Sequence, residues 1–510
     1  MEAVQSISRS ASAGRLQTLA WAVIGLVLVT YGLIAFNAGT KISPAMTEGG
    51  TAAAKVDYIR TQSDQGVAMA DTAEALEVIP FWIRLIGKIE SSEYALGSDS
   101  IMETEQHYYA MPETKRNVLG THMMLGIVLM TAGFFQFWPS FRRKHRTAHR
   151  VLGVTYVLAA VSSMSMSSYY LLNTSIDDVY SQFIFYAGLW ALVGISMGSI
   201  GMAIWSIYQR NIAAHLGWQA LAFGCFLTAP IQRFMWIGLS PLSNGRTFNE
   251  VNILVNVALL PLAFLAGYAL FCANRASSPL RQDADVTAPI APWIKQGLVG
   301  LASIAFLLTA IFLSFAGLEA SEITRGLTMP DAARTHDAVL SGGQGFMLTA
   351  MLGLVLLFGV RLLMAEHTAL KTRGTEVVAL AGVAGVSSAV MLLCGYRLGM
   401  PSHEQSLAGV GYALNGALLL LFAVLALRQF GRGETGKLHE ALWFVVLLSM
   451  SPALMYVTLF ALHAIGLVPS PYDQQGHGYQ LAAGVALLTP ILVGHVRAVY
   501  SRETRRHAIN

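Results

Sequence analysis

Two histidines at the starts of apolar segments could share a metal cofactor. His149 and His215 each follow a short polar stretch, so their imidazoles are expected at one depth on two different helices. Bis-histidine ligation of haem b needs one axial nitrogen on each side of the iron. The pair therefore indicates a haem b site, with no metal beyond the haem iron. The alternative is that His-Arg at a helix end only anchors the helix at the membrane interface, which the neighbouring basic residues favour: Arg142, Arg143, Lys144, Arg146 and Arg150.

A second group of polar residues is expected near the opposite membrane face. His122 and Arg233 lie inside apolar segments, and ionisable residues there are costly enough to suggest a function. Three further polar side chains, together with Gln232 beside Arg233, are expected at the same depth: Ser165, Ser168 and Tyr169. This layer predicts a site that binds an anionic or hydrogen-bonding small molecule from outside. The alternative is that Arg233 reaches toward the interface and the serines only allow close helix packing.

These residues also form a recognisable pattern. An intramembrane His122, the pair Gln136-Phe137 and the run His149-Arg150-x-x-Gly153-x-x-Tyr156 are followed by Ala214-His215-Leu216-Gly217-Trp218 and Arg233. This pattern, over about residues 115–240, resembles the bacterial membrane proteins grouped as domain of unknown function 2306. Leu216 departs from it, because Arg is expected after the second His. The resemblance implies a helical membrane architecture in a bacterial inner membrane, and no particular activity.

The composition requires a membrane environment. The 510 residues are 54% hydrophobic and 12% charged, with a mean hydropathy of +0.53, which is outside the range of soluble domains. The three cysteines are widely spaced in apolar runs, so neither disulfides nor a zinc site is expected. Walker A and H-E-x-x-H motifs are absent from the sequence, and no G-x-G-x-x-G follows a predicted strand. The expected partners are the lipid bilayer and a small molecule, and not nucleic acid.

Hydrophobic length predicts an all-α integral membrane protein with about twelve transmembrane helices. The segments lie at about 18–36, 117–139, 150–173, 182–208, 215–239, 251–273, 296–316, 337–364, 376–396, 408–428, 440–465 and 479–500. With both termini cytoplasmic, the inner segments hold 21 of the 33 Lys and Arg residues and the short outer loops hold four. Positive residues favour the cytoplasmic side, so this orientation is predicted. The first segment follows Arg9 and Arg15 and is expected to be a retained signal anchor.

The longest outer loop, residues 37–116, is large enough to fold. It contains twelve acidic and seven basic residues. Between residues 73 and 92, apolar side chains recur at helical spacing: Leu76, Ile79, Trp82, Ile83 and Ile86. Such an amphipathic segment is expected to cap the helix bundle or to lie on the membrane surface.

A polar stretch at 274–295 is predicted to be a cytoplasmic linker between two six-helix halves, residues 1–273 and 296–510. The fifth and eleventh segments are alike. One begins with His215 and has Pro230 fifteen residues on, while the other begins with His439 and has Pro452 thirteen residues on. A duplicated six-helix unit is common among transporters.

The remaining histidines offer weaker candidates. His336 and His463 are expected near outer helix ends, His367 and His439 near inner ends, and all four are interpreted as surface residues. His367 and His439 would mark a second haem only if the halves are duplicated. His495 lies one turn from the inner end of the last segment, with no partner evident in the sequence.

Three function classes follow from these patterns. A b-type haem-binding redox protein would use His149 and His215 for electron transfer. A small-solute transporter or ligand-binding protein would use His122 and Arg233. A structural or accessory membrane protein would leave all of these residues in packing roles. The sequence does not decide whether the protein is an enzyme.

Overall fold

The computed structural model describes residues 2–43, 49–179, 181–239, 247–276, 291–315, 343–399 and 409–500. Within these residues every regular element is a helix and there is no strand. Ten helices are long and apolar enough to cross a membrane, and the number rises to twelve if each of two bent helix pairs counts as one span. The structure therefore confirms the predicted all-α membrane fold.

Six spans form the N-terminal half. They are α1 (Glu2–Ile42), α7 (Glu113–Phe137), α9 (Arg146–Leu172), α10 (Gln182–Tyr208), the pair α11 (Ile212–Phe226) and α12 (Thr228–Leu239), and α13 (Phe248–Ala276). The apolar part of α1 begins at Gln17. A short helix, α8 (Pro139–Lys144), carries much of the basic loop between α7 and α9.

The C-terminal half has the same order of spans. They are α14 (Pro292–Ala310), which continues as a π-helix through Phe315, then α17 (Gly343–Met364), α19 (Gly374–Leu398), α20 (Val410–Gly431), the pair α21 (Thr435–Ser449) and α22 (Ser451–Ala464), and α24 (His477–Tyr500). Short helices α18 (His367–Leu370) and α23 (Ser470–Gln474) lie in the connections. The observed limits agree with the predicted segments to within a few residues, although residues 337–342 lie outside the described part.

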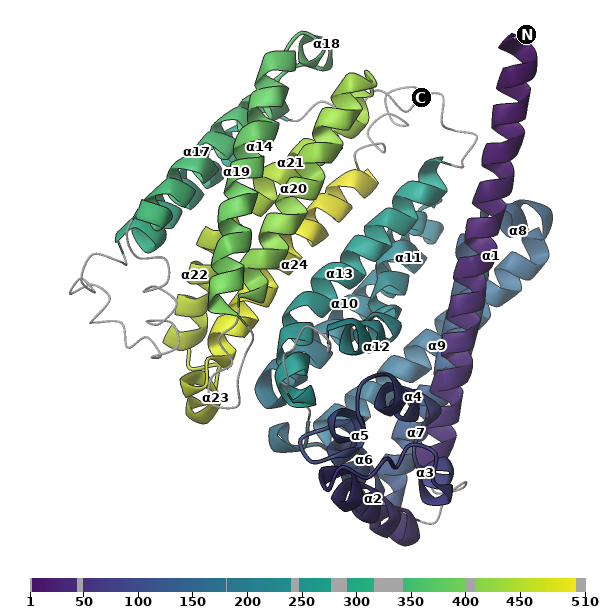
Figure 1. The fold of residues 1–510 in the computed structure, drawn as a ribbon. Helices are drawn as coiled ribbons and strands as arrows, with labels where there is room; N and C mark the ends of the chain where they lie inside the picture. Colours follow the sequence, from purple (N-terminus) through teal and green to yellow (C-terminus); the bar gives the residue numbers. More distant parts are fainter. Residues whose placement is uncertain are drawn as a thin grey trace.

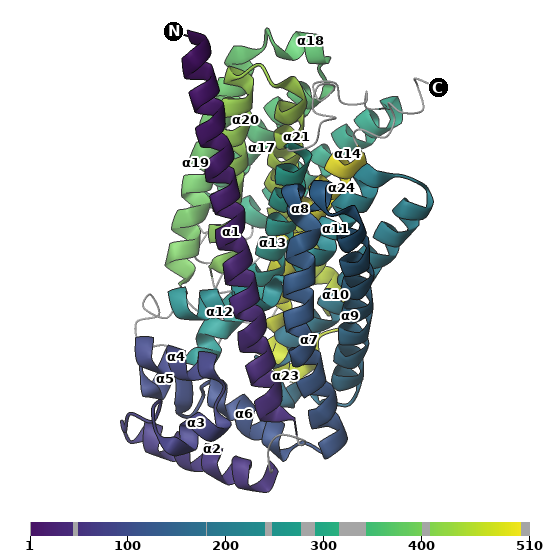
Figure 2. The same cartoon turned by 90° about the vertical axis from the view of Figure 1, so that its right-hand side faces the viewer.

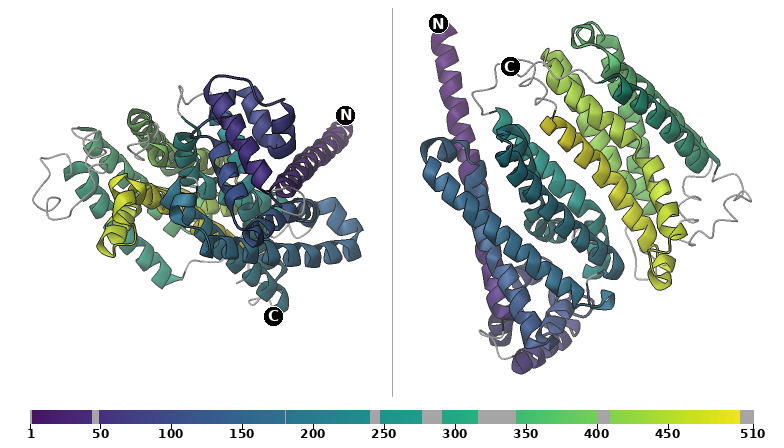
Figure 3. Two further views of the ribbon diagram at one scale, coloured as in Figure 1. Left: turned by 90° about the horizontal axis from the view of Figure 1, so that it is seen from below. Right: turned by 180° about the vertical axis from the view of Figure 1, so that it is seen from behind.

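The helices lie in three layers (Figure 1, Figure 3). One layer contains α1, α7 and α9, the next contains α10, α11 and α13, and the third contains the C-terminal spans. The start of α1, α8 and α18 lie at one end of the bundle, here called the basic end (Figure 2). Helices α2 to α6 cover the opposite end, here called the cap end.

The fifth span of each half is bent at a proline. Helices α11 and α12 meet at 44°, and α21 and α22 meet at 45°. Pro230 and Pro452 lie just after these breaks and lack the N–H that would bond the preceding turn, so each interrupts its helix. The sequence predicted two continuous spans here, and the structure instead breaks both in corresponding positions.

The sixth spans, α13 and α24, pack against each other where the halves meet. Pro261 lies 13 residues after the start of α13, and Pro490 lies 13 residues after the start of α24. Each helix then has a glycine at a close contact. A Cβ on Gly267 would lie 2.8 Å from the Ala220 carbonyl oxygen in α11, and one on Gly494 would lie 2.5 Å from the Phe444 ring in α21. The two sixth spans thus correspond in the position of a proline and in having a closely packed glycine.

The cap domain, residues 49–111, consists of five short helices. They are α2 (Gly49–Asp64), α3 (Ala73–Val78), α4 (Phe81–Ile89), α5 (Ser92–Leu96) and α6 (Ile101–Ala110). The side chains of Trp82, Ile83 and Ile86 are buried in a cluster with Trp236 and Phe248 from the membrane helices. The amphipathic segment predicted from the sequence thus caps the bundle, although Leu76 is 49% exposed.

Candidate functional site

Arg233 lies on α12, six residues after the break in the fifth span. Its Nη1 donates to the Ala229 carbonyl oxygen at 3.2 Å and to Gln232 Oε1 at 3.0 Å. Within the described residues no carboxylate forms an ion pair with it, and Nη2 and Nε donate to no protein group. A cation inside a membrane usually has a charged partner. Because Nη2 and Nε are not engaged by the described residues, Arg233 has N–H groups that could donate to a ligand.

Two tryptophans hold the guanidinium in place. Arg233 Cζ lies 5.0 Å from the Trp82 ring centroid and 5.1 Å from that of Trp236. The two indoles stack with centroids 5.5 Å apart and an interplanar angle of 21°. Trp82 belongs to the cap domain and Trp236 to α12, so the cap domain forms one wall of the site. Cation–π contacts of this kind hold an Arg without neutralising its charge.

A chain of amides orients Gln232, which in turn binds Arg233. Gln232 Nε2 lies 3.5 Å from Asn252 Oδ1, and the same oxygen accepts from Trp236 Nε1 at 2.9 Å. Asn252 Nδ2 donates to Ser181 Oγ at 3.0 Å. Gln232, Asn252 and Trp236 are all buried. The network therefore fixes the side of Arg233 that faces α13.

His122 is held by α9 at the same end of the bundle. Its Nδ1 lies 3.0 Å from the Ser163 carbonyl oxygen, 2.9 Å from Ser163 Oγ and 3.0 Å from Ser167 Oγ. No hydrogen bond from Nε2 to any of the described residues is present. Arg233 is close enough to act electrostatically on this imidazole, so the two residues lie in the same region of the bundle.

The predicted α9 residues are not those that meet His122. Ser165 and Tyr169 lie on the exposed face of α9, and Ser168 Oγ donates to the Met164 carbonyl oxygen at 2.9 Å. The residues in contact, Ser163 and Ser167, are one turn apart on the face toward α7. The run of serines in the sequence predicted their depth along α9, but it could not predict which of them face α7.

Two residues of this site were missed by the sequence analysis. Glu105 on α6 is 2% exposed, its Oε2 has no partner, and Arg233 acts on it electrostatically. Tyr31 on α1 is half-buried and is also within electrostatic reach of Arg233. Neither had a distinguishing signal, because Glu105 is one of twelve acidic residues in its loop and Tyr31 is an aromatic residue in an apolar helix. The candidate site consists of Arg233, Gln232, His122, Trp82, Trp236, Glu105 and Tyr31, and it is called the anion site below after the ligand proposed for it.

His149 and His215 lie at the basic end, close enough to interact electrostatically. His215 Nδ1 lies 3.0 Å from the Ala203 carbonyl oxygen, and His149 Nδ1 is buried without a partner. Two turns deeper, the Tyr156 ring lies 6.3 Å from Phe223 and 5.9 Å from Phe226. These rings pack together between α9 and α11, on the interior side of the two histidines.

The other histidines are distributed in packing roles. His439 is 3% exposed, and its Nε2 lies 3.3 Å from the Leu363 carbonyl oxygen, so the prediction of a surface histidine was wrong there. His463 is half-buried and lies 3.2 Å from Asp473. His495 Nε2 lies 2.9 Å from the Gly217 carbonyl oxygen of the other half, a partner the sequence did not indicate. His336 and the side chain of His367 lie outside the described residues.

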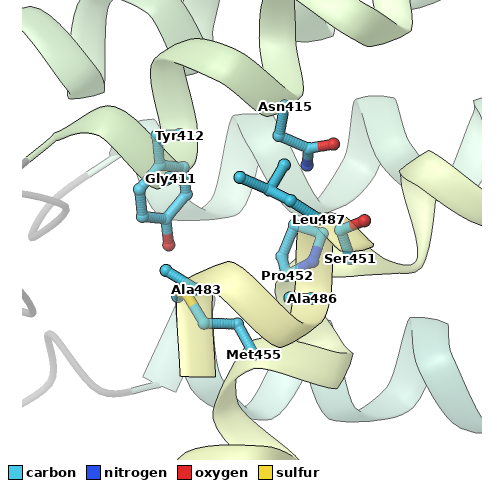
Figure 4. Close-up of a pocket in the computed structure, with 9 residues that line it drawn as sticks. All are labelled: Gly411, Tyr412, Asn415, Ser451, Pro452, Met455, Ala483, Ala486 and Leu487. Carbon is cyan, nitrogen blue, oxygen red and sulfur yellow. The ribbon is translucent and has the colours of Figure 1, made fainter. Parts of the chain in front are cut away.

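A small pocket lies beside the bend of the C-terminal half (Figure 4). It is lined by Gly411, Tyr412, Asn415, Ser451, Pro452, Met455, Ala483, Ala486 and Leu487, with a cavity volume of about 10 Å³. Asn415 Oδ1 and Ser451 Oγ are buried there without protein partners. A space of this size suits a single water molecule, which could satisfy both oxygens.

The fold and its intramembrane polar layer define a polytopic membrane protein. Residues 119–270 match the family model described as "Predicted membrane protein (DUF2306)". The match runs from α7 through most of α13 and includes His122, Gln232 and Arg233, while the cap domain lies outside it. No match to the chain was found among curated proteins or solved structures.

Proposed function

We propose that the protein binds a small anionic solute at the cap end of its membrane bundle and that this site serves transport across the membrane. The observation that carries the proposal is Arg233 on a membrane helix, whose guanidinium contacts two stacked indoles and has no carboxylate partner among the described residues. An Arg of this kind offers a planar pair of donors suited to carboxylate or phosphate groups. The class of ligand follows from that chemistry.

His122 and Gln232 extend the recognition beyond charge. The Nδ1 contacts with Ser163 and Ser167 fix the His122 ring and leave Nε2 available to a polar group on the ligand. Gln232 is already engaged with Arg233 and Asn252, so it orients the guanidinium. The site is therefore organised to hold an anion in a defined direction.

The bent fifth spans support transport as the role of this site. Interrupted hydrophobic spans in corresponding positions of two repeats are typical of secondary transporters, whose substrates bind near such breaks. Arg233 lies six residues after the α11–α12 break at Leu227. A receptor would not require a second bent span in the other half.

Ligand screening by thermal unfolding tests the proposal. The purified protein would be heated in detergent with acetate, phosphate or sulfate, and with neutral acetamide as the matched control. A ligand that binds only the folded state raises the unfolding temperature. We expect at least one anion to do so while acetamide does not. Equal responses to acetate and acetamide would contradict the proposal. Uptake of the stabilising anion into proteoliposomes would then separate transport from binding alone.

A second candidate function is haem-dependent electron transfer through His149 and His215. Its support is that the Ala203 carbonyl fixes His215 through Nδ1 and leaves Nε2 as a potential ligand atom. The absorption spectrum of protein purified from haem-replete cells tests this candidate. A reduced low-spin haem spectrum, lost in both His149→Ala and His215→Ala, would favour it. A colourless preparation would exclude it.

A further inference from the structure

We propose that the anion site takes up one proton together with its anion and that Glu105 of the cap domain holds this proton. The inference rests on the proposed anion site and adds to it the coupled ion. Glu105 lies outside the residues that match the family model. Its role is therefore argued only from its place in this structure.

The burial of Glu105 requires an explanation. Its side chain is 2% exposed and its Oε2 has no hydrogen-bond partner among the residues that the structure describes. A buried ionised carboxylate without partners is costly, whereas the protonated acid is tolerated. Glu105 and Arg233 form no ion pair, although the guanidinium acts on the carboxyl electrostatically. Burial raises the pKa of Glu105 to about 8, and Arg233 opposes part of this increase.

Few charged groups face this carboxyl. Arg233 approaches from α12, and Tyr109 lies one turn away on α6 with its hydroxyl donating to the Lys41 and Val78 carbonyl oxygens at 2.9 and 2.8 Å. Arg116 of α7 lies 5.2 Å from the Tyr109 ring. Burial raises the pKa of the Tyr109 hydroxyl, which therefore stays neutral.

Two further polar residues of α6 are engaged elsewhere. Gln106 accepts from Arg60 of α2 at 2.6 Å, and His107 lies 3.7 Å from Asp178. Arg233 is thus the cation that interacts electrostatically with Glu105. Arg233 in turn acts on Tyr31 and His122, so a proton on Glu105 affects the whole site.

The coupling follows from competition for one guanidinium. Ionised Glu105 would attract Arg233 and oppose an incoming anion, whereas protonated Glu105 leaves the charge of Arg233 to the ligand. By linkage, a bound anion must raise the proton affinity of Glu105 by the same factor. Glu105 is protonated below its pKa, so anion affinity is highest there and falls as the pH rises through that value.

The test measures acetate binding from about pH 6 to about pH 10 by the fluorescence of the site tryptophans, because acetate stays ionised throughout this range. In the wild-type protein we expect a constant dissociation constant at low pH that then increases by up to tenfold per pH unit above about pH 8. Glu105→Gln should bind acetate with no dependence on pH in this range. The matched control Glu103→Gln changes an exposed carboxylate on the same helix and should behave as the wild type.

Infrared spectroscopy of the protein without ligand separates the two proposals. A protonated carboxyl band that titrates near pH 8 and disappears in Glu105→Gln would support the proton site whether or not acetate binds. Acetate binding that is equally independent of pH in wild type and Glu105→Gln, with no such band, would overturn the inference and leave the anion site standing. Acetate binding absent at every pH, with the other anions also inactive, would overturn the anion site.

Discussion

The Arg233 guanidinium lies 5.0 Å from the ring centroid of Trp82, and this contact joins a membrane helix to the cap domain. Trp82 also stacks on Trp236, which brings the two indoles and the guanidinium into one cluster. The cap domain is therefore part of the site and does more than cover it. Movement of α4 relative to α12 would alter both the position of the charge and the access of a ligand.

Trp82→Ala should weaken the docking of the cap domain. Truncation of a buried Trp costs about 3–5 kcal/mol, since packing is lost and a cavity remains. We expect a lower unfolding temperature and faster tryptic cleavage within the cap domain. Trp293→Ala serves as the control, because Trp293 is 73% exposed on α14. Equal behaviour of the two variants would show that Trp82 does not hold the cap.

The buried ion pair between α13 and α21 should contribute strongly to the contact between the halves. Arg275 donates to both carboxylate oxygens of Glu440 at 2.7 and 2.6 Å, and the side chains are 11% and 9% exposed. Glu440→Gln leaves the arginine buried without its partner, so a loss of about 3–5 kcal/mol in unfolding free energy is expected. Glu434→Gln, which affects an i,i+3 pair with Lys437, should cost at most about 1 kcal/mol. A comparable effect of both changes would contradict this assignment.

Close packing of the sixth span on the fifth predicts a sharp contrast between two glycines. A Cβ at position 267 would lie 2.8 Å from a backbone oxygen of α11, so Gly267→Ala should destabilise the protein by about 1–3 kcal/mol. Gly188→Ala places its methyl group in open space on α10 and should be neutral or slightly stabilising. Thermal unfolding of the two variants checks the packing. A stable Gly267→Ala protein would show that α11 and α13 are farther apart.

The orientation predicted from basic residues is tested by reporter fusions. Alkaline phosphatase joined at Arg143 should be inactive, because α8 is expected on the cytoplasmic side. A fusion at Ser91 in the cap domain should be active, since the structure places the cap at the opposite end of the bundle. Activity at Arg143 would invert the topology and place the proposed anion site on the cytoplasmic side of the membrane.

The sequence predicted the spans well because hydrophobic length alone determines them. The sequence also placed Arg233 and His122 at one depth, since depth follows from the count of residues along a helix. It did not distinguish Ser163 and Ser167 from Ser165 and Ser168, because rotation about the helix axis depends on packing against α7. A proline follows each of the bends at Leu227 and Met450 in the sequence. Tertiary packing nevertheless decides whether a proline only curves a helix or breaks it.

Residues contributed by distant segments could not be predicted. Glu105 reaches the site only because five short helices fold over the bundle, and its exceptional burial has no local pattern in the sequence. The burial of Trp82, in contrast, was indicated by the helical spacing of the apolar residues in α4. The sequence did not reveal that its partners would be Trp236 and Arg233, which lie about 150 residues away.

The most direct test of the central claim is a fluorescence titration of the purified protein and its Arg233→Leu variant with the anion that stabilises it best. Loss of a hydrogen-bonded charge from a binding site costs at least about 2 kcal/mol, which is about a thirtyfold loss of affinity. We expect this loss in Arg233→Leu, with a partial loss in Arg233→Lys, while the control Arg397→Leu, at an exposed arginine, should bind as the wild type does. Unchanged anion affinity in a folded Arg233→Leu protein would contradict the account.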